Sequence, residues 1–235
     1  MERHLDDELK KFNNDLLQMA TLTEEAIHKS IQALKKQDKH LAEKIIVEDQ
    51  RIDNFENAIE EQTVELLALF QPMAVDLRFV TTGRRLSAEL ERIADMVVNI
   101  CQRVIDIADE PLVKPLEDIP LLAENARKMV RMAIDAFVAR DEDLAVEVIL
   151  SDKESNRLRN AIMHELIHDY LVKDGTAAPR AIPLLLIARD LERISDHATA
   201  IAEDVIYMVR AKVVRHHPEL LAEGEGQEQE GGASV

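Results

Sequence analysis

Apolar residues recur along two stretches of the chain at alternating steps of three and four positions, which is the spacing of one face of an α-helix. In the first stretch the apolar positions are Leu86, Leu90, Ile93, Val97, Ile100 and Val104. In the second they are Ile187, Leu191, Ile194, Ala198, Ile201, Val205 and Met208. Mostly polar residues fill the positions between, so each stretch predicts an amphipathic helix that buries one face.

Breaks in this pattern fall where helix-ending residues gather, and they divide the chain into six long helices. The breaks lie at Gln37–Asp38, at Gln71–Pro72, across Pro111, Pro115 and Pro120, at Arg140–Asp141, and between Asp174 and Pro183. The predicted helices span residues 3–36, 38–70, 73–109, 118–139, 141–173 and 180–216. The connections between them are short, which favours antiparallel packing of neighbouring helices.

The chain also repeats itself. A D-x-x-L-A motif that begins at Asp38 recurs at Asp141, 103 residues later, and LERIADMVVNI from Leu90 matches LERISDHATAI from Leu191 at a spacing of 101 residues. The sequence therefore predicts an all-α, internally duplicated fold of two antiparallel three-helix bundles, residues 1–110 and 116–217. The remaining residues, 218–235, are acidic with little to bury, and we expect a disordered tail there.

Composition and charge narrow the possible partners and the compartment. The net charge of −17 opposes direct binding to nucleic acid or to anionic lipid. The single cysteine, Cys101, cannot form an intrachain disulfide and lies in an apolar helical run, which predicts a buried thiol in a reducing compartment. The N-terminus has no apolar signal core and no hydrophobic run is long enough to span a bilayer, so we expect a cytoplasmic protein.

Pairs of acidic residues four positions apart lie beside the apolar stripes, on one face of their helices. They are Glu91 and Asp95, Glu192 and Asp196, Asp49 and Asp53, and, with an amide in place of one acid, Asp152 and Asn156. Like charges at this spacing repel, and a bound cation would offset the repulsion: carboxylates suit Mg²⁺, Ca²⁺ or Mn²⁺, and a nearby His197 or Asn99 would also suit Fe or Zn. Two alternatives stay open, a solvated acidic edge and internal pairing with Arg92 and Arg193.

A second metal hypothesis comes from two E-x-x-H spacings, which carboxylate-bridged di-iron bundles use. Glu25 and His28 form one pair, and Glu165 and His168 form the other. The two pairs do not correspond under the repeat, so they fall in different bundles, whereas a di-iron centre needs both in one core. The chain contains no P-loop, no Rossmann glycine motif and no nucleophile elbow, and we expect no catalytic activity.

The duplicated motifs, together with the segment QPMAVDLR from Gln71 to Arg78, resemble the PhoU proteins, accessory regulators of bacterial phosphate uptake. The resemblance runs from end to end and implies a non-catalytic, cytoplasmic homodimer of two three-helix bundles that represses the phosphate-starvation response. It also implies two partners, the ATPase subunit of the phosphate ABC transporter and a sensor histidine kinase. Any membrane association would then be indirect, through those partners.

Some members of that family bind multinuclear metal clusters through paired E/D-x-x-x-D motifs. By resemblance, the ligands here are Asp49, Asp53, Glu91 and Asp95 in the first repeat, and Asp152, Asn156, Glu192 and Asp196 in the second, holding Fe, Zn, Mn or Mg. The chain departs from the family pattern at Asn156, where an acid is expected, and at Met96, where the second repeat has His197. The two sites are therefore expected to differ, and a metal-free helical scaffold is the plain alternative.

Overall fold

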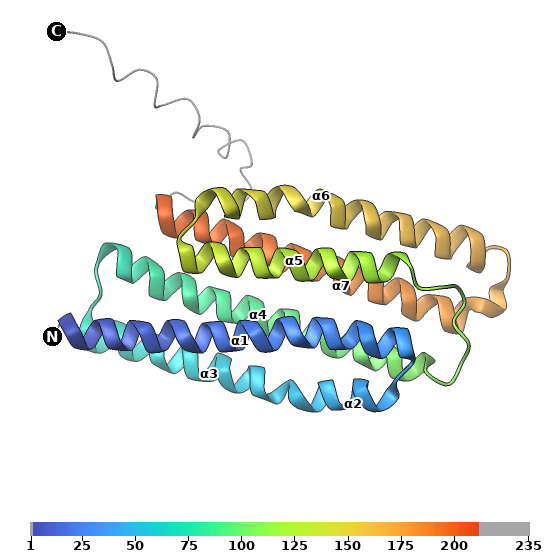
Figure 1. Ribbon diagram of the computed structural model, residues 1–235, viewed down its shortest axis with the longest axis horizontal. Coiled ribbons are helices and arrows are strands. Elements are labelled where there is room, and N and C mark those ends of the chain that lie inside the picture. Colours follow the sequence, from blue (N-terminus) through green and yellow to red (C-terminus); the bar gives the residue numbers. More distant parts are fainter. Residues whose placement is uncertain (1, 212–235) are drawn as a thin grey trace, which may run out of the picture.

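The computed structural model describes residues 2–211, and nearly all of them are helical (Figure 1). In chain order the elements are α1 (Glu2–Lys36), α2 (Lys39–Glu48), α3 (Gln50–Glu65), η1 (Leu66–Phe70), α4 (Ala74–Ile107), α5 (Asp118–Ala139), α6 (Glu142–Glu165), η2 (Leu166–Leu171), η3 (Gly175–Ala177) and α7 (Ala178–Arg210). Within residues 2–211 there is no strand, and the all-α prediction is confirmed. The end of the last predicted helix, 212–216, and the predicted tail, 218–235, lie outside the described residues.

The motif shared by Asp38 and Asp141 is a helix start. Each aspartate accepts a hydrogen bond, at 3.0 Å, from the backbone N–H three residues further on, which caps the new helix. The residue before each one, Gln37 or Arg140, adopts a left-handed φ of 50° or 54° and ends the preceding helix. The duplication therefore retains two equivalent helix corners, and this explains why so short a motif recurs.

The predicted helix 38–70 is divided at Asp49 into α2 and α3, although Asp49 keeps helical backbone angles and its N–H still donates to the carbonyl of Ile45 at 3.1 Å. There the N–H of Ile52 donates to the carbonyl of Asp49 at 2.7 Å, a three-residue bond that tightens the turn. The corresponding helix of the second repeat, α6, passes through Asp152 without a break. The six predicted helical rods are present, and the rod of the first repeat has a tightened turn at a candidate site residue, Asp49, that α6 lacks at Asp152.

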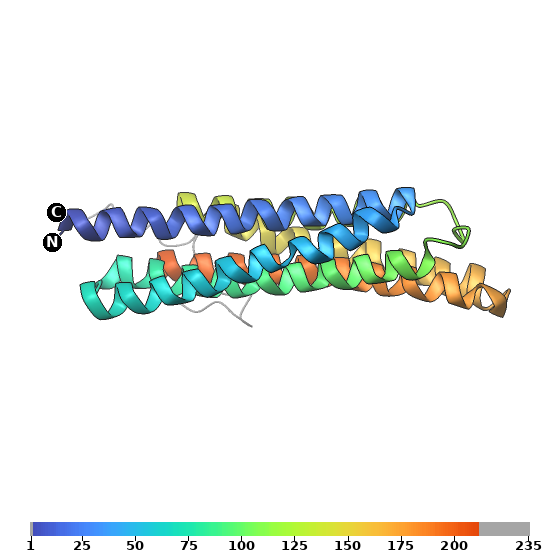
Figure 2. The same ribbon diagram turned by 90° about the horizontal axis from the view of Figure 1, so that it is seen from below.

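The two bundles lie side by side in one elongated molecule, with the long helices close to its long axis (Figures 1 and 2). The first bundle consists of α1, the α2–α3 rod and α4, and the second of α5, α6 and α7. Between the bundles, α4 packs along α7 and α1 packs along α5. The buried apolar residues of both bundles form one continuous core, so the repeats share a hydrophobic interface as well as a linker.

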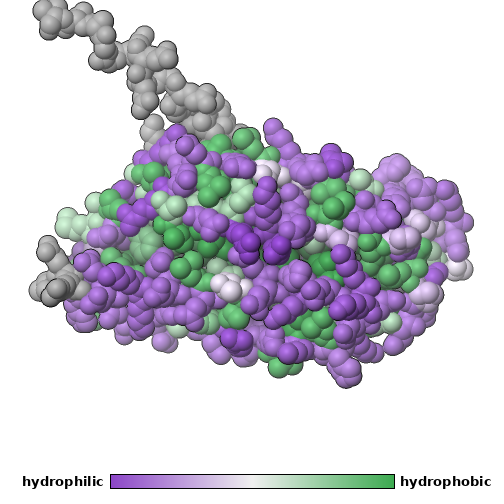
Figure 3. All heavy atoms as spheres, viewed as in Figure 1, coloured by the Kyte–Doolittle hydropathy of each residue, from purple (hydrophilic) through white to green (hydrophobic). Residues whose placement is uncertain are grey.

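The interior and the surface agree with the sequence pattern. Cys101 is fully buried, as predicted, and this burial together with the nearby Asp49 raises the pKa of its thiol to about 12. Apolar side chains are scattered among hydrophilic ones on the face shown in Figure 3. No helix within residues 2–211 has an apolar stretch long enough to cross a membrane.

A close approach of α4 to α1 occurs at Gly83. A methyl group at this position would lie 2.5 Å from Cε1 of Phe12 and 2.9 Å from Cδ1 of Leu16, and both of these α1 side chains are buried. We expect Gly83→Ala to lower the free energy of unfolding by about 1 kcal/mol, because overpacking outweighs the gain in helix propensity. Urea denaturation measures this change.

Gly175→Ala is the matched control, because its added methyl group meets open space. Its stability should stay within about 0.5 kcal/mol of wild type. A Gly83→Ala protein as stable as the control would contradict the expected clash.

Candidate functional site

The predicted acids of the first repeat meet where α3 packs on α4. Asp49 lies between α2 and α3, and Asp53 follows one turn later. Glu91 and Asp95 lie on α4, each directly after a buried residue, Leu90 or Ala94, so the packing of those residues places the acids at the edge of the core. Glu91 is half-buried there, and Asp95 is exposed.

The pKa values of these carboxyls reflect their closeness. Loss of hydration, followed by repulsion from Asp53 and Asp95, raises the pKa of Asp49 to about 6. Loss of hydration, followed by repulsion from Asp95, Glu56 and the other acids, also raises the pKa of Glu91. Ionising all of these groups together is therefore unfavourable. The structure brings the four predicted acids of the first repeat into one electrostatic cluster.

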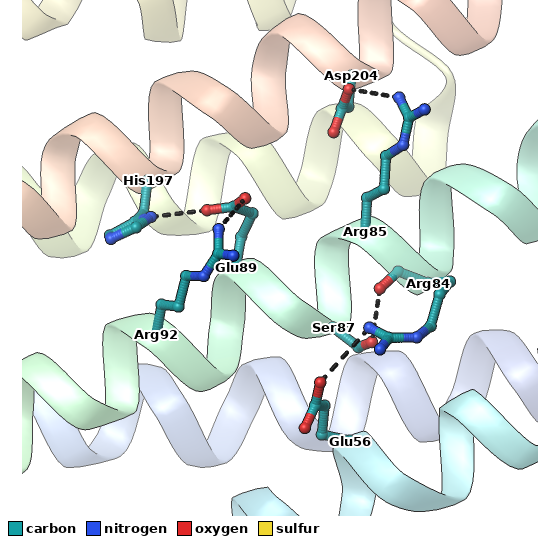
Figure 4. A network of polar contacts seen from close by, with 8 residues as sticks. All are labelled: Glu56, Arg84, Arg85, Ser87, Glu89, Arg92, His197 and Asp204. Atoms are coloured by element: carbon teal, nitrogen blue, oxygen red, sulfur yellow. Dashed lines mark hydrogen bonds and ion pairs between the residues drawn. The ribbon is translucent and has the colours of Figure 1, made fainter.

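Across residues 2–211, none of these four carboxylates forms an ion pair with a lysine, an arginine or a histidine. Arg92, which the sequence offered as an internal partner, pairs with Glu89 at 3.0 Å (Figure 4). Asp53 accepts a hydrogen bond from the amide of Gln50 at 3.3 Å. The first repeat thus holds its acids together without a compensating positive charge on them.

One acid of this cluster was missed by the motif pattern. Glu56 on α3 raises the pKa of Glu91 and forms an ion pair with Arg84 at 3.4 Å (Figure 4). Arg84 also pairs with Glu60, at 3.0 Å. The sequence held one indication of this residue. At the repeat spacing of 103 residues Glu56 corresponds to Arg159, so both repeats have a charged side chain at this position.

The second repeat joins its polar side chains through hydrogen bonds. Nδ2 of Asn156 donates to Oδ2 of Asp152 at 2.7 Å. Nη2 of Arg159 donates to Oε1 of Glu192 at 2.8 Å and to Oδ1 of Asn156 at 3.2 Å. These bonds connect α6 to α7 and place a guanidinium group among the predicted ligands.

Asp196 lies at the exposed edge of this second cluster. Partial loss of hydration, followed by repulsion from Glu192 and Asp152, raises its pKa to about 6, while the charges of His197 and Arg159 act in the opposite direction. Loss of hydration and repulsion from Glu192 also raise the pKa of Asp152. The structure therefore also brings together the four predicted residues of the second repeat, and here Arg159 lies among them.

His197, considered above as a nearby ligand, contacts the opposite bundle. Its Nδ1 lies 2.6 Å from Oε2 of Glu89 on α4 (Figure 4). Two ion pairs cross the same α4–α7 interface, Arg103 with Asp190 at 2.9 Å and Arg85 with Asp204 at 3.1 Å. His197 therefore contributes to the contact between the bundles.

The two E-x-x-H pairs remain in different bundles, on α1 and at the junction of α6 with η2. The acid of each pair already has a cationic partner, Lys29 for Glu25 at 2.9 Å and Lys114 for Glu165. In the part of the chain that the structure describes, no three His, Cys, Asp or Glu side chains converge as a metal ion would require. The di-iron hypothesis gains no support, and the acidic clusters as placed do not enclose an ion.

Comparison with known proteins identifies a family for both repeats. The PhoU domain matches residues 16–104 and again residues 119–205. A PhoU homologue of the phosphate-specific transport system from Aquifex aeolicus is 37% identical over 209 residues, covering 89% of this chain and 94% of its own. A second homologue, from Thermotoga maritima, is 32% identical over 222 residues and 94% of each chain. The crystal structure of PhoU from Pseudomonas aeruginosa superposes with a TM-score of 0.84 at 34% identity, covering 88% of this chain and 99% of that one.

Asp49→Asn should stabilise the protein in the presence of a chelator at pH 8. A carboxyl with a pKa raised from 3.8 to about 6 binds its proton more tightly in the folded state, so stability is lost as the pH rises through that window. Removing the charge should recover about 1 kcal/mol once solvent screening is allowed for, and less at pH 5. Thermal unfolding at both pH values measures the effect.

Glu61→Gln controls for the change in net charge, because Glu61 lies on the exposed face of α3. Equal melting temperatures of the two variants at pH 8 would show that the cluster around Asp49 is not repulsive.

Proposed function

This chain belongs to the PhoU family, and we propose that it is a non-enzymatic accessory protein that regulates phosphate uptake. The observation that carries the proposal is the extent of the match: both repeats fit the PhoU domain. Relatives that match along nearly the whole chain are named as accessory proteins of the phosphate-specific transport system. Regulation of that transport system is the function that such a match supports best.

The proposed role also specifies where the protein acts and which partners it contacts. The protein acts in the cytoplasm as a homodimer, contacts the transporter ATPase subunit and a sensor histidine kinase, and keeps the phosphate-starvation response repressed while phosphate is plentiful. The charge of −17 favours protein partners over nucleic acid or anionic membranes. Exposed apolar side chains at the turn between η1 and α4 also favour a protein contact, because Leu69 is 74% exposed and Met73 is 81% exposed.

Deletion of the gene should switch on phosphate-starvation genes in cells grown with abundant phosphate. The wild-type gene on a plasmid should restore repression, and an empty plasmid should not. A tagged chain should also co-purify the transporter ATPase subunit and the kinase from phosphate-rich cells. Normal repression in the deletion strain would contradict the proposed role.

For the acidic clusters, we propose that carboxylates bind a metal ion such as Fe, Zn, Mn or Mg. The candidate ligands are Asp49, Asp53, Glu91 and Asp95 in the first repeat and Asp152, Asn156, Glu192 and Asp196 in the second. The raised pKa values of Asp49 and Glu91 support the proposal, because they mark carboxylates that repel one another. When bound, the metal supplies positive charge that offsets this repulsion and ties α3 to α4.

Elemental analysis of protein purified without chelator tests the metal proposal. The wild-type protein should carry bound metal, and Glu91→Ala should carry less, because one oxygen ligand is lost. Glu61→Gln, outside the cluster, should retain the wild-type content. A wild-type protein free of metal in repeated preparations, and unable to take up added Mn²⁺, would contradict the proposal.

A further inference from the structure

A groove lies between α1 and α3 in the first bundle, where the α2–α3 rod runs obliquely to α1 (Figure 2). It has a volume of about 460 Å³ and adjoins a smaller cavity of about 70 Å³ that reaches toward α2 and α4. Leu22 and Arg51 line both, so the outer groove and the inner cavity form one continuous site. The volume of the outer groove falls within the range of small-molecule sites, roughly 300–1,000 Å³.

The second repeat fills the equivalent place with side chains. Ala26, in the wall of the inner cavity, corresponds at the spacing of 103 residues to Met129, which is fully buried. Ile52, another wall residue, corresponds to Ser155, whose Oγ accepts a hydrogen bond from Nδ2 of Asn125 at 2.8 Å and lies 3.5 Å from the sulfur of Met129. The inner cavity of the first repeat therefore lies where the second repeat has a larger side chain and a polar bridge.

Arg51 is the positively charged residue of the outer groove. Its side chain is exposed, and within residues 2–211 it makes no ion pair. Lys29, the other cation in the wall of the inner cavity, already pairs with Glu25 at 2.9 Å and with Glu48 at 4.0 Å. The position of Arg51 is occupied in the second repeat by Glu154. Only the groove of the first repeat thus offers an arginine to an anion.

Phe55 gives the same groove an aromatic surface. It lies one turn after Arg51 on the same face of α3, it is half-buried, and in the described part of the chain its ring contacts no other aromatic ring. Asn14 and Gln18, one turn apart on α1, line the opposite wall with neutral amide groups. The second repeat has Leu158 in place of the phenylalanine. A cation, a ring and neutral hydrogen-bonding groups therefore meet in one groove.

We infer that this groove binds a small aromatic anion of the nucleoside monophosphate class, with the phosphate beside Arg51 and the base against Phe55. Guanidinium groups bind phosphate well, and aromatic side chains stack on bases. The amides of Asn14 and Gln18 offer donors and acceptors to the edge of the base or to the sugar hydroxyls. Acids such as Asp49 line the inner cavity, so it admits the uncharged edge of the base and repels the phosphate.

Titration calorimetry of the full chain with adenosine 5′-monophosphate (AMP), in the presence of a chelator, tests the inference without any contribution from bound metal. AMP should bind at one site per chain. Adenosine lacks the phosphate and ribose 5-phosphate lacks the base, so each should bind roughly tenfold more weakly or worse, and inorganic phosphate should bind no better than ribose 5-phosphate. Absence of AMP binding, or equal affinity for AMP and any of these three compounds, would overturn the inference.

Two substitutions test the contacts at either end of the ligand. Arg51→Gln should weaken AMP binding roughly tenfold, and Phe55→Leu, which introduces the residue of the second repeat, should do the same. Arg157→Gln, at a side chain that is 64% exposed on α6, and Phe70→Leu, at a half-buried ring in η1, are the matched controls and should bind as wild type does. Arg51 is exposed, so its loss leaves the core intact. Equal AMP affinities of Arg51→Gln and Arg157→Gln would contradict the assigned phosphate contact.

Filling the inner cavity provides a third variant. Ala26→Met introduces the side chain that the second repeat buries at this place, so the variant should melt no lower than wild type. It should bind AMP roughly fourfold more weakly, the equivalent of one buried CH₂ group. Ala161→Met, at an exposed position of α6, is the control. Equal AMP affinity of the two methionine variants would overturn the placement of the base, and none of these results depends on the proposed metal binding or on the proposed role in phosphate uptake.

Discussion

The packing of α4 along α7 is the contact on which the rest of the molecule depends. It brings the two motif helices, whose apolar stripes are buried, side by side and joins both bundles into one core. Because residues such as Leu90 and Leu191 must face that core, the acids that follow them come to lie at its edge. Four polar contacts fix how α4 lies along α7: three involve charged side-chain pairs, such as Arg103 with Asp190, and in the fourth Arg78 donates to the carbonyl of Met208. The acidic clusters are therefore placed by hydrophobic packing.

The two repeats differ in how the charge of their clustered carboxylates is balanced. Burying several carboxylates beside one another costs stability unless a positive charge is near, and proteins tolerate such costs mainly where function requires them. The second repeat meets the requirement internally through Arg159 and Asn156. The first repeat leaves Asp49 and Glu91 with raised pKa values and has a tightened helical turn at Asp49. The two repeats therefore share their helix starts and their buried core, and they differ in the charged residues at the edge of that core.

Much of this architecture follows from local rules. The helix starts at Asp38 and Asp141 follow from side-chain capping, and the amphipathic period identified the buried stripes and the burial of Cys101. The tightened turn at Asp49 was not predictable in this way, because neither proline nor glycine marks it. The π-helical segments η1 and η2 likewise carry no sequence signal that separates them from the α-helices they extend.

The sequence by itself determined the six helical rods, the duplication and the presence of paired acids, because each depends on spacing along one helix. Only the tertiary structure decided which acids share a cluster, since Glu56 and Arg159 act on residues of a different helix, more than thirty positions away. It also decided that His197 contacts Glu89 in the other bundle, and that the bundles share a core. Those outcomes depend on how helices pack side by side, and hydrophobic spacing says which face is buried without saying which neighbour covers it.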